Sequence, residues 1–270
     1  MIIFKSINKL NKEVNFKANI GFVPTMGAIH KGHASLISSS KKKCQKTIVS
    51  IFVNPSQFNK KNDFHKYPRK LTSDIKILKS LKVDYLLIPK LNEIYKNKKS
   101  MKIKLNLKDK VLCAKYRPGH FEGVLAVINQ FLLRLKPKYI FFGEKDYQQL
   151  HLARKFIKKK FKTKIISCPT VRDKNNVALS SRNILLNAED LKKSSYIAKL
   201  LFKFKNNLKK NISNKKNLNT IILKLNKIKN IKVEYLEIRN KNNLSKLYDK
   251  RNFKIFLAYY NKKIRLIDNY

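Results

Sequence analysis

The sequence predicts an α/β protein in which a Rossmann-like, doubly wound parallel sheet is followed by a second, smaller α+β domain. Short β-branched and aromatic runs alternate with helical stretches up to about residue 170, an order typical of parallel sheets covered by helices. All six glycines precede residue 144, and residues 171–270 contain neither glycine nor proline. With 270 residues, the chain can form one large domain or two modest ones. We therefore predict a larger domain over 1–170 and a smaller one over 171–270.

Each element of the larger domain is predicted from a local pattern. Residues 19–25 form a short apolar strand that ends in a turn, residues 34–46 have helical periodicity, and residues 47–53 are a β-branched strand. The order continues with a helix over 71–81, a strand over 84–89, a helix over 122–135, a strand over 139–142, a helix over 146–160 and a strand over 164–168. Ligands of such sheets bind beyond the carboxyl ends of the strands, so we expect the functional site there.

The smaller domain is predicted to contain two helices and three strands. Asn187, followed by Glu189 and Asp190, is a suitable N-cap with acidic residues in the first helical turn. The predicted elements are helices over 187–208 and 217–229 and strands over 231–239, 252–260 and 263–268.

The net charge of +47 raises the hypothesis of a nucleic-acid-binding protein. Only nine of the 63 cationic residues are arginine, and the lysines are spread along the chain, whereas base and phosphate recognition relies on arginine. We therefore interpret most of this charge as solvated background and expect no specific nucleic-acid partner. The three scattered cysteines lack a CxxC spacing, which fits the cytoplasm better than a disulfide framework. No apolar run approaches the length of a membrane span, and we expect no membrane partner.

The strongest local signal is PTMGAIHKGH at residues 24–33, where the first apolar strand leads into a helix. His30 and His33 are three residues apart, so both imidazoles can face one ligand. A helix N-terminus adds free N–H groups and partial positive charge, which suit a phosphate. This pattern predicts a nucleotide site; the alternatives are two histidines bonded within a turn, or two metal ligands.

Four further segments carry polar side chains that could belong to the site. Asn54 and Gln57 follow the second strand, and the Gln57 amide could both donate to a carboxylate and accept from a hydroxyl. Asp74 lies on the next helix as a possible magnesium contact. His120, in RPGHFEG at residues 117–123, is either an orienting group or a histidine packed at a helix start. In residues 143–149, GEKDYQQ, Lys145 is suited to contact phosphate.

The segment ALSSRN at residues 178–183 joins the two predicted domains. Its two hydroxyl groups lie beside Arg182, one of the few arginines, and together they could bind a triphosphate on a mobile loop. The alternative is an ordinary serine-rich turn.

Taken together and in this order, these segments closely resemble the pantoate–β-alanine ligase family. The matching blocks are PTMGAIHKGH (24–33), SIFVNPSQF (50–58), YPR (67–69), RPGHFEGV (117–124), FGEKDYQQL (142–150), LSSRN (179–183) and RLIDN (265–269). The resemblance runs essentially from end to end. It implies an enzyme that condenses (R)-pantoate with β-alanine, using ATP and releasing AMP and pyrophosphate. It also implies Mg²⁺, a homodimer and a small lid over 171–270.

The resemblance also implies roles for individual residues. His33 would be the proton donor, with His30, Lys145 and Arg182 as further catalytic residues, and Gln57 and Gln149 would hold pantoate, Gln57 also β-alanine. Asp74 would lie near the magnesium, although Ser73 stands where relatives often have a second acid. The implied ATP-binding residues are Met26, Gly27, Ala28, Ile29, His30, Lys31, Gly32, His33, Gly143, Glu144, Lys145, Asp146, Val171, Leu179, Ser180, Ser181 and Arg182.

The resulting hypothesis is attack of the pantoate carboxylate on the α-phosphorus of ATP. The imidazoles, Lys145, Arg182 and Mg²⁺ would offset the negative charge, and the amine of β-alanine would then attack the pantoyl adenylate. Two rival functions remain at this level. One is another nucleotidyltransferase with the HxGH pattern, which would act on a phosphorylated substrate; the other is the basic nucleic-acid-binding protein.

Overall fold

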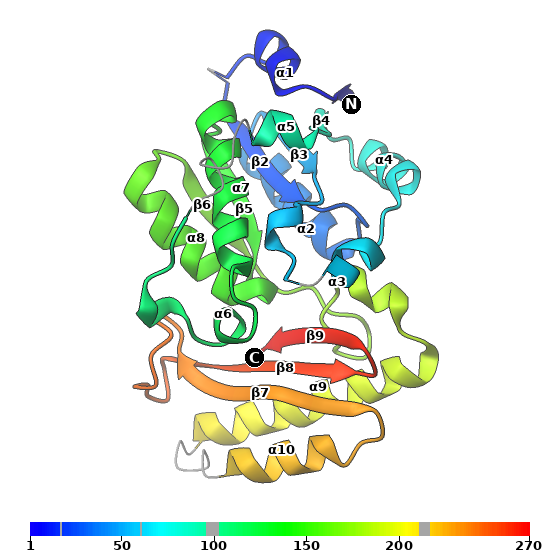
Figure 1. The fold of residues 1–270 in the computed structure, drawn as a ribbon, viewed down its shortest axis with the longest axis vertical. Helices are drawn as coiled ribbons and strands as arrows, with labels where there is room; N and C mark the ends of the chain where they lie inside the picture. Colours follow the sequence, from blue (N-terminus) through cyan, green and yellow to red (C-terminus); the bar gives the residue numbers. More distant parts are fainter. Residues whose placement is uncertain (17, 60, 96–102, 211–216) are drawn as a thin grey trace.

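The computed structural model describes residues 1–270 except 17, 60, 96–102 and 211–216. Its larger part is built on a parallel sheet with the strand order β1-β4-β3-β2-β5-β6 (Figure 1). The strands are β1 Ile2–Phe4, β2 Ile20–Thr25, β3 Lys46–Ile51, β4 Tyr85–Leu87, β5 Tyr139–Gly143 and β6 Lys164–Cys168. The doubly wound parallel sheet predicted from the sequence is confirmed.

Helices cover both faces of this sheet because neighbouring residues of a strand point to opposite sides. On β2, Phe22 packs with α7 His120–Leu135 and α8 Tyr147–Lys160, whereas Val23 packs with α2 Lys31–Lys43 and α4 Leu71–Ser80. The short helices α1 Ile7–Glu13 and α5 Leu91–Ile94 extend the first of these layers. Strands buried on both faces explain the nearly continuous apolar runs in the sequence.

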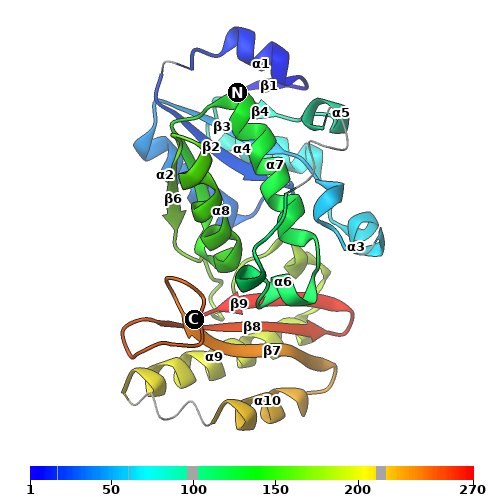
Figure 2. The same cartoon turned by 60° about the vertical axis from the view of Figure 1, so that its left-hand side comes forward.

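The remaining chain forms an antiparallel sheet of strand order β7-β8-β9. Its strands are β7 Ile231–Asn240, β8 Phe253–Asn261 and β9 Ile264–Asn269, and its helices are α9 Ala188–Lys210 and α10 Leu218–Asn226. One sheet face packs on both helices, and the other contributes Tyr235 and Phe256 to a cluster with Cys113 and Phe121. Figure 2 shows this sheet lying between the parallel-sheet part and α10. The predicted α+β character of this region is confirmed.

The element boundaries differ from the sequence predictions where side chains cap the backbone. Helix α2 begins at Lys31, three residues before the predicted start, because His30 is its N-cap. Residues Glu144–Asp146 form the 3₁₀ helix η4 before α8. Asn187 caps as predicted: its Oδ1 accepts from the Asp190 N–H at 2.8 Å.

Several short elements escaped the sequence analysis altogether. They are β1, α1, α3 Lys61–Lys66, α5, α6 Cys113–Tyr116 and the 3₁₀ helices η1 Pro55–Gln57, η3 Leu107–Asp109 and η5 Ser181–Leu185. Three to seven residues are too few to establish a period. Among the described residues, no helix has the length and apolarity required to cross a membrane.

The strand order creates a crevice at one edge of the parallel sheet. From β2 the chain moves outward through β3 and β4, and it returns to place β5 on the other side of β2. Such a switch point leaves a gap beyond the carboxyl ends of the two neighbouring strands. Thr25 and Gly143 end β2 and β5, so the motifs that follow these residues lie at this gap.

Gly123 allows α7 to approach η1 closely. A Cβ at this position would clash with the Ser56 carbonyl and lie 2.8 Å from the Gln57 nitrogen. The Asn54 side chain also donates to the Gly123 carbonyl at 3.0 Å. The glycine therefore determines how near η1, with Gln57, lies to the apolar helix.

We predict that Gly123→Ala destabilises the protein by about 1–3 kcal/mol, because backbone must shift to relieve the clash. Thermal unfolding measures the effect. Gly143→Ala is the matched control, since its Cβ would meet only Leu36 Cδ2 at 4.0 Å and its φ of −79° suits alanine. Equal melting temperatures of the two variants would contradict this account of Gly123.

Candidate active site

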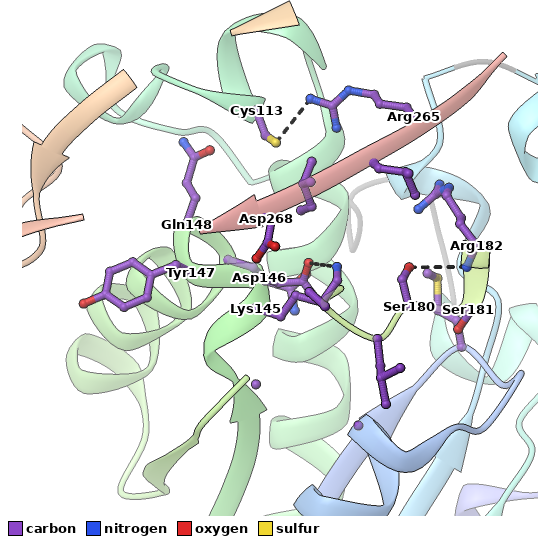
Figure 3. Close-up of a pocket in the computed structure, with 18 of the residues that line it drawn as sticks. Cys113, Lys145, Asp146, Tyr147, Gln148, Ser180, Ser181, Arg182, Arg265 and Asp268 are labelled. Carbon is purple, nitrogen blue, oxygen red and sulfur yellow. Dashed lines mark hydrogen bonds and ion pairs between the residues drawn. The ribbon is translucent and has the colours of Figure 1, made fainter. Parts of the chain in front are cut away.

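A single cavity of about 930 Å³ lies beyond the carboxyl ends of β2 and β5. It is bounded by α7 on one side, by β9 of the antiparallel sheet on another, and by the loop that contains Ser180 and Arg182 (Figure 3). Residues from both parts of the chain therefore form one site.

The turn between β2 and α2 has an unusual backbone conformation. Gly27 has φ of +80° and Ala28 has φ of +49°, a left-handed region that disfavours side chains. The Asp74 carboxylate holds the turn by accepting from the Ala28 N–H at 2.8 Å and the Ile29 N–H at 2.7 Å. Asp74 is only 2% exposed, and a Cβ on Gly27 would lie 2.9 Å from its Oδ2. Asp74 is thus a buried acceptor that shapes the turn.

The expectation that Asp74 contacts magnesium stays a prediction. Both of its oxygens already accept backbone hydrogen bonds, and the residue is buried beneath the turn. In the part of the chain that the structure describes, no group of three or more His, Cys, Asp or Glu side chains could hold a metal ion. Mg²⁺ keeps several waters and commonly binds substrate phosphates with one or two carboxylates.

His30 and His33 are held in one tautomer by the start of α2. His30 Nδ1 accepts from the Gly32 N–H at 3.1 Å, and His33 Nδ1 accepts from the His30 N–H at 3.4 Å, which completes a capping box. Because each Nδ1 is an acceptor, each neutral ring carries its proton on Nε2. The ring centroids are 4.1 Å apart, and both residues line the cavity. The helix start therefore presents two Nε2–H donors.

The two rings are neutral in the free protein. Burial and, second, repulsion from the Lys145 ammonium lower the pKa of His30 to about 4, against an opposing effect of the Asp146 carboxylate. Burial likewise lowers the pKa of His33 to about 3, with added repulsion from His30 and Lys145. In the free site the imidazoles are therefore uncharged hydrogen-bond donors, and the cations beside them are Lys145 and Arg182.

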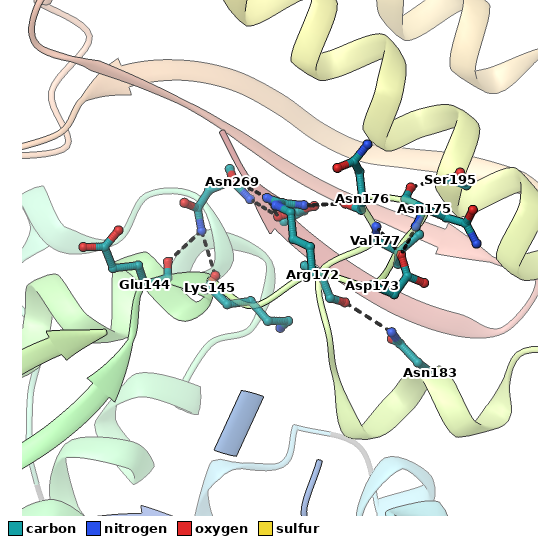
Figure 4. A network of polar contacts seen from close by, with 12 residues as sticks. Glu144, Lys145, Arg172, Asp173, Asn175, Asn176, Val177, Asn183, Ser195 and Asn269 are labelled. Atoms are coloured by element: carbon teal, nitrogen blue, oxygen red, sulfur yellow. Dashed lines mark hydrogen bonds and ion pairs between the residues drawn. The ribbon is translucent and has the colours of Figure 1, made fainter. Parts of the chain in front are cut away.

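Lys145 and the last strand are connected through the turn after β5. Lys145 Nζ lies 3.3 Å from Asp146 Oδ1, and the Asn269 amide donates to the Glu144 and Lys145 carbonyls, both at 2.8 Å. Arg172 forms two bonds to the neighbouring Asp268, at 2.7 and 2.8 Å. Figure 4 shows this network joining the end of the chain to the turn that carries Lys145.

The loop with the two serines contacts the histidine turn directly. Ser181 Oγ donates to the Ala28 carbonyl at 3.3 Å, and Ser180 Oγ accepts from the Arg182 N–H at 3.3 Å. The Arg182 guanidinium is bound to the Asp63 carboxylate, at 3.1 and 3.0 Å. Asp63 lies in the short α3, and no sequence signal pointed to it. The cation expected to bind phosphate is therefore paired with an acid in the free protein.

The two expected substrate glutamines occupy different environments. Gln57 is buried, with Nε2 2.6 Å from Met26 Sδ and Oε1 accepting from Asn54 at 3.3 Å. Gln149 lines the same cavity, as do apolar residues of α7. Its neighbour Gln148 donates to the Asp109 and Val111 carbonyls.

His120, the first residue of α7, packs on Phe121 and also forms two hydrogen bonds. Its Nδ1 lies 2.7 Å from the Gln57 carbonyl, and its Nε2 lies 3.0 Å from Arg117 Nη1. Because a carbonyl only accepts, Nδ1 carries the proton and Nε2 accepts from the guanidinium. Burial, followed by repulsion from Arg117, lowers the pKa of His120 well below its usual value.

The structure brings most of the predicted residues together. The cavity is lined by Met26, His30, Gly32, His33, Gln57, Gly143, Lys145, Asp146, Gln149, Val171, Leu179, Ser180, Ser181 and Arg182. Gly27, Ala28, Ile29, Lys31 and Glu144 do not line it, and Lys31 is exposed. Sequence reasoning missed Asp63, Cys113, Tyr235 and Arg265, which lie in short helices or on the antiparallel sheet and line the cavity.

The chain matches one protein family almost from end to end. Residues 2–270 match the model described as Pantoate-beta-alanine ligase. A pantothenate synthetase of Francisella tularensis subsp. mediasiatica (strain FSC147) is 40% identical over 268 residues, covering 98% of this chain and 94% of the relative. One of Clostridium botulinum (strain 657 / Type Ba4) is 39% identical over 269 residues, covering 98% and 95%.

Solved structures show the same similarity. The pantoate-beta-alanine ligase of Francisella tularensis, crystallised with beta-gamma ATP and beta-alanine, has a TM-score of 0.86 at 39% identity and covers 100% of this chain and 97% of that one. The pantothenate synthetase of Thermus thermophilus has a TM-score of 0.89 at 30% identity, with 100% and 99% covered.

We predict that Asp74→Asn lowers the free energy of unfolding by about 1–3 kcal/mol, because an amide offers one acceptor where two buried N–H groups need partners. Urea unfolding measures this change, with Asp249→Asn, which alters an exposed loop carboxylate, as the control. A variant of unchanged stability whose ATP affinity recovers at high Mg²⁺ would instead indicate a metal ligand.

We also predict that stability declines as the pH falls from 6.5 toward 4.5. The unfolded histidines take up protons in this range, while His33, with a pKa of about 3, and His30, with a pKa of about 4, do so only at lower pH. The unfolded state then binds more protons than the folded state. Between pH 6.5 and pH 4.5, His33 alone therefore lowers the free energy of unfolding by on the order of 2 kcal/mol. His33→Gln should show a shallower pH dependence in urea unfolding; an identical slope would contradict the neutral assignment.

Proposed function

The chain belongs to the family of pantoate–β-alanine ligases, and from this membership we propose how its own residues carry out the reaction. It is an ATP-dependent ligase that joins pantoate to β-alanine. We propose that the carboxylate of (R)-pantoate first attacks the α-phosphorus of ATP and displaces pyrophosphate. The β-alanine amine then attacks the acyl carbon of pantoyl adenylate and displaces AMP, forming pantothenate.

The observation that carries this proposal is the paired Nε2–H donors at the start of α2. They share one cavity with Lys145 and with the loop of Ser180 and Arg182. Negative charge builds on the oxygens of the α-phosphate and on departing pyrophosphate during nucleotidyl transfer. Fixed donors and cations aimed at those oxygens stabilise the transition state. Once bound phosphate has raised its pKa, His33 would take up a proton from solvent and donate it to the departing pyrophosphate.

The apolar side of the cavity suits the acyl substrate. Val124, Val127 and Phe131 of α7 line it, and they offer a surface for the two methyl groups of pantoate. Gln57 and Gln149 would bond to its hydroxyl and carboxylate groups. In this arrangement the pantoate carboxylate lies between the apolar wall and the histidine turn.

Magnesium would arrive as part of the ATP substrate. Mg²⁺ commonly reaches such sites on substrate phosphates, which supports this assignment. Asp63 would lose its bond to Arg182 when the triphosphate binds, because the phosphate oxygens compete for the same guanidinium.

We further propose that residues 171–270 act as a lid that shelters the adenylate from water. The bonds from Asn269 to the turn of Glu144 and Lys145 support this role. The family resemblance supports a homodimer in the cytoplasm. The excess of lysine needs no nucleic-acid partner in this proposal.

Pantoate-dependent exchange of pyrophosphate into ATP tests the proposed order of steps. We predict exchange without β-alanine, because adenylate formation is reversible and precedes amine attack. Exchange that requires β-alanine, or that proceeds without pantoate, would contradict the adenylate mechanism.

We predict that His33→Ala lowers kcat for this exchange by about 10²–10³-fold, since it removes a donor to developing charge. His65→Ala is the matched control, because His65 is exposed on α3 and does not line the cavity. Steady-state kinetics with both variants checks the prediction. Wild-type kcat in a folded His33→Ala variant would remove His33 from the mechanism.

A further inference from the structure

The turn that carries Lys145 is held by a residue from the other part of the chain. This turn is η4, a 3₁₀ helix of three residues, and short 3₁₀ helices have poor hydrogen-bond geometry of their own. Its N-cap, Gly143, has no side chain that could cap it, and the Asp146 side chain at the N-cap of α8 pairs with Lys145 Nζ at 3.3 Å. The Asn269 amide donates to the carbonyls of the first two residues of η4, both at 2.8 Å (Figure 4). The position of the turn therefore depends on Asn269.

The Asn269 side chain is itself fixed in one orientation. It is buried, and its Oδ1 accepts from Lys254 Nζ at 2.8 Å. Because an ammonium only donates and a carbonyl only accepts, the amide oxygen must face Lys254 and the two amide N–H groups must face the turn. The Asn269 backbone carbonyl accepts from Arg172 Nη2 at 3.0 Å, and Asp268 binds the same guanidinium. The amide therefore cannot rotate without breaking hydrogen bonds.

The other end of the turn is also anchored to the antiparallel sheet. Tyr147, the first residue of α8, follows η4 directly. Lys254 Nζ lies 4.8 Å from the centroid of the Tyr147 ring, which also packs against Phe256 at 5.9 Å between centroids. The Tyr147 hydroxyl donates to the Lys241 carbonyl at 3.0 Å. Both ends of η4 are thus fixed by residues of 171–270, although the turn itself belongs to the parallel-sheet part.

We propose that Asn269, oriented by Lys254, is a positioning residue that aims the Lys145 ammonium at the phosphates, an inference that rests on the proposed function. Asn269 acts through the backbone, because it binds the Lys145 carbonyl and leaves the ammonium to meet the phosphates. A displacement of about 1 Å can cost about 10²-fold in rate. Since Asn269 ends the antiparallel sheet, Lys145 is correctly placed only while this sheet is docked. The contact therefore couples the proposed lid to phosphate chemistry.

A double-mutant cycle tests whether Asn269 acts through Lys145. The wild type, Asn269→Leu, Lys145→Met and the double variant are assayed for pantoate-dependent ATP–pyrophosphate exchange at saturating substrates. Leucine keeps the approximate shape of asparagine without its hydrogen bonds, and methionine keeps most of the lysine stem without its charge. We expect each single variant to lower kcat by about 10²-fold. In the Lys145→Met background, Asn269→Leu should change kcat by less than about 2-fold.

Asn261→Leu is the matched control. Asn261 is also a buried asparagine of the antiparallel sheet, and its side chain donates to a backbone carbonyl, that of Asp190, at 3.0 Å. It does not line the cavity. The variant should lose stability in thermal unfolding as Asn269→Leu does, but its kcat should stay within about 2-fold of the wild type. Equal losses of kcat in the two variants would attribute the effect to a weakened sheet and would overturn the inference.

Effects that multiply in the double variant would also overturn the inference, because Asn269 would then act independently of Lys145. Wild-type kcat in Lys145→Met would instead contradict the proposed function, in which Lys145 meets the phosphates. If Asn269→Leu does not fold, Lys254→Met decides, since it removes the bond that orients the amide while methionine fills the half-buried space of the lysine stem. Its kcat should fall by about 10-fold, and this loss should disappear in the Lys145→Met background. Wild-type kcat in Lys254→Met would reject the proposal.

Discussion

The site depends on the hydrogen bonds that fix the turn between β2 and α2. Asp74 accepts from two backbone N–H groups of this turn, and the capping box then uses Nδ1 of both His30 and His33. These bonds leave each ring one proton, on Nε2, and they orient it before a ligand arrives. Preorganised donors need no rearrangement when charge develops on a phosphate. The Asp74 carboxylate is not expected to contact the nucleotide, but it fixes the turn that presents the two histidines to the phosphates.

Different elements line the cavity with chemically different side chains. The ends of β2 and β5, with the serine loop, supply donors and cations, whereas α7 supplies an apolar wall. Because Gly123 has no side chain, η1 lies close to α7. Gln57 therefore lies between the polar and the apolar lining of the cavity. The antiparallel sheet lines another side of the site and is linked to the turn of Lys145 through Asn269.

Much of the fold could be predicted because long elements carry a repeated pattern. The apolar strands and the helices α7 and α8 bury whole faces, and those faces are visible in the sequence. The start of α2 was misplaced because histidine is an uncommon N-cap, and its role depends on a bond to the following turn. The helix α3 was not predicted because its few residues are too short a stretch to show a period. Asp63, which lies in this helix and pairs with Arg182, was therefore not predicted either.

The residues that form the site could be predicted from the sequence more fully than their ionisation states and hydrogen bonds. The family blocks identified the histidines, Lys145 and Arg182, but ionisation depends on burial and on neighbours that only the folded chain brings together. The family resemblance places Asp74 near magnesium, whereas its two hydrogen bonds to backbone N–H groups are visible only in three dimensions.

The most direct test of this account is ¹⁵N NMR of the imidazole rings in the free protein at neutral pH. His30 and His33 are predicted to show a protonated Nε2 and an unprotonated Nδ1 in each ring. Protonation at Nδ1, or at both nitrogens, would contradict the claim that the helix start presents two neutral Nε2–H donors to the nucleotide.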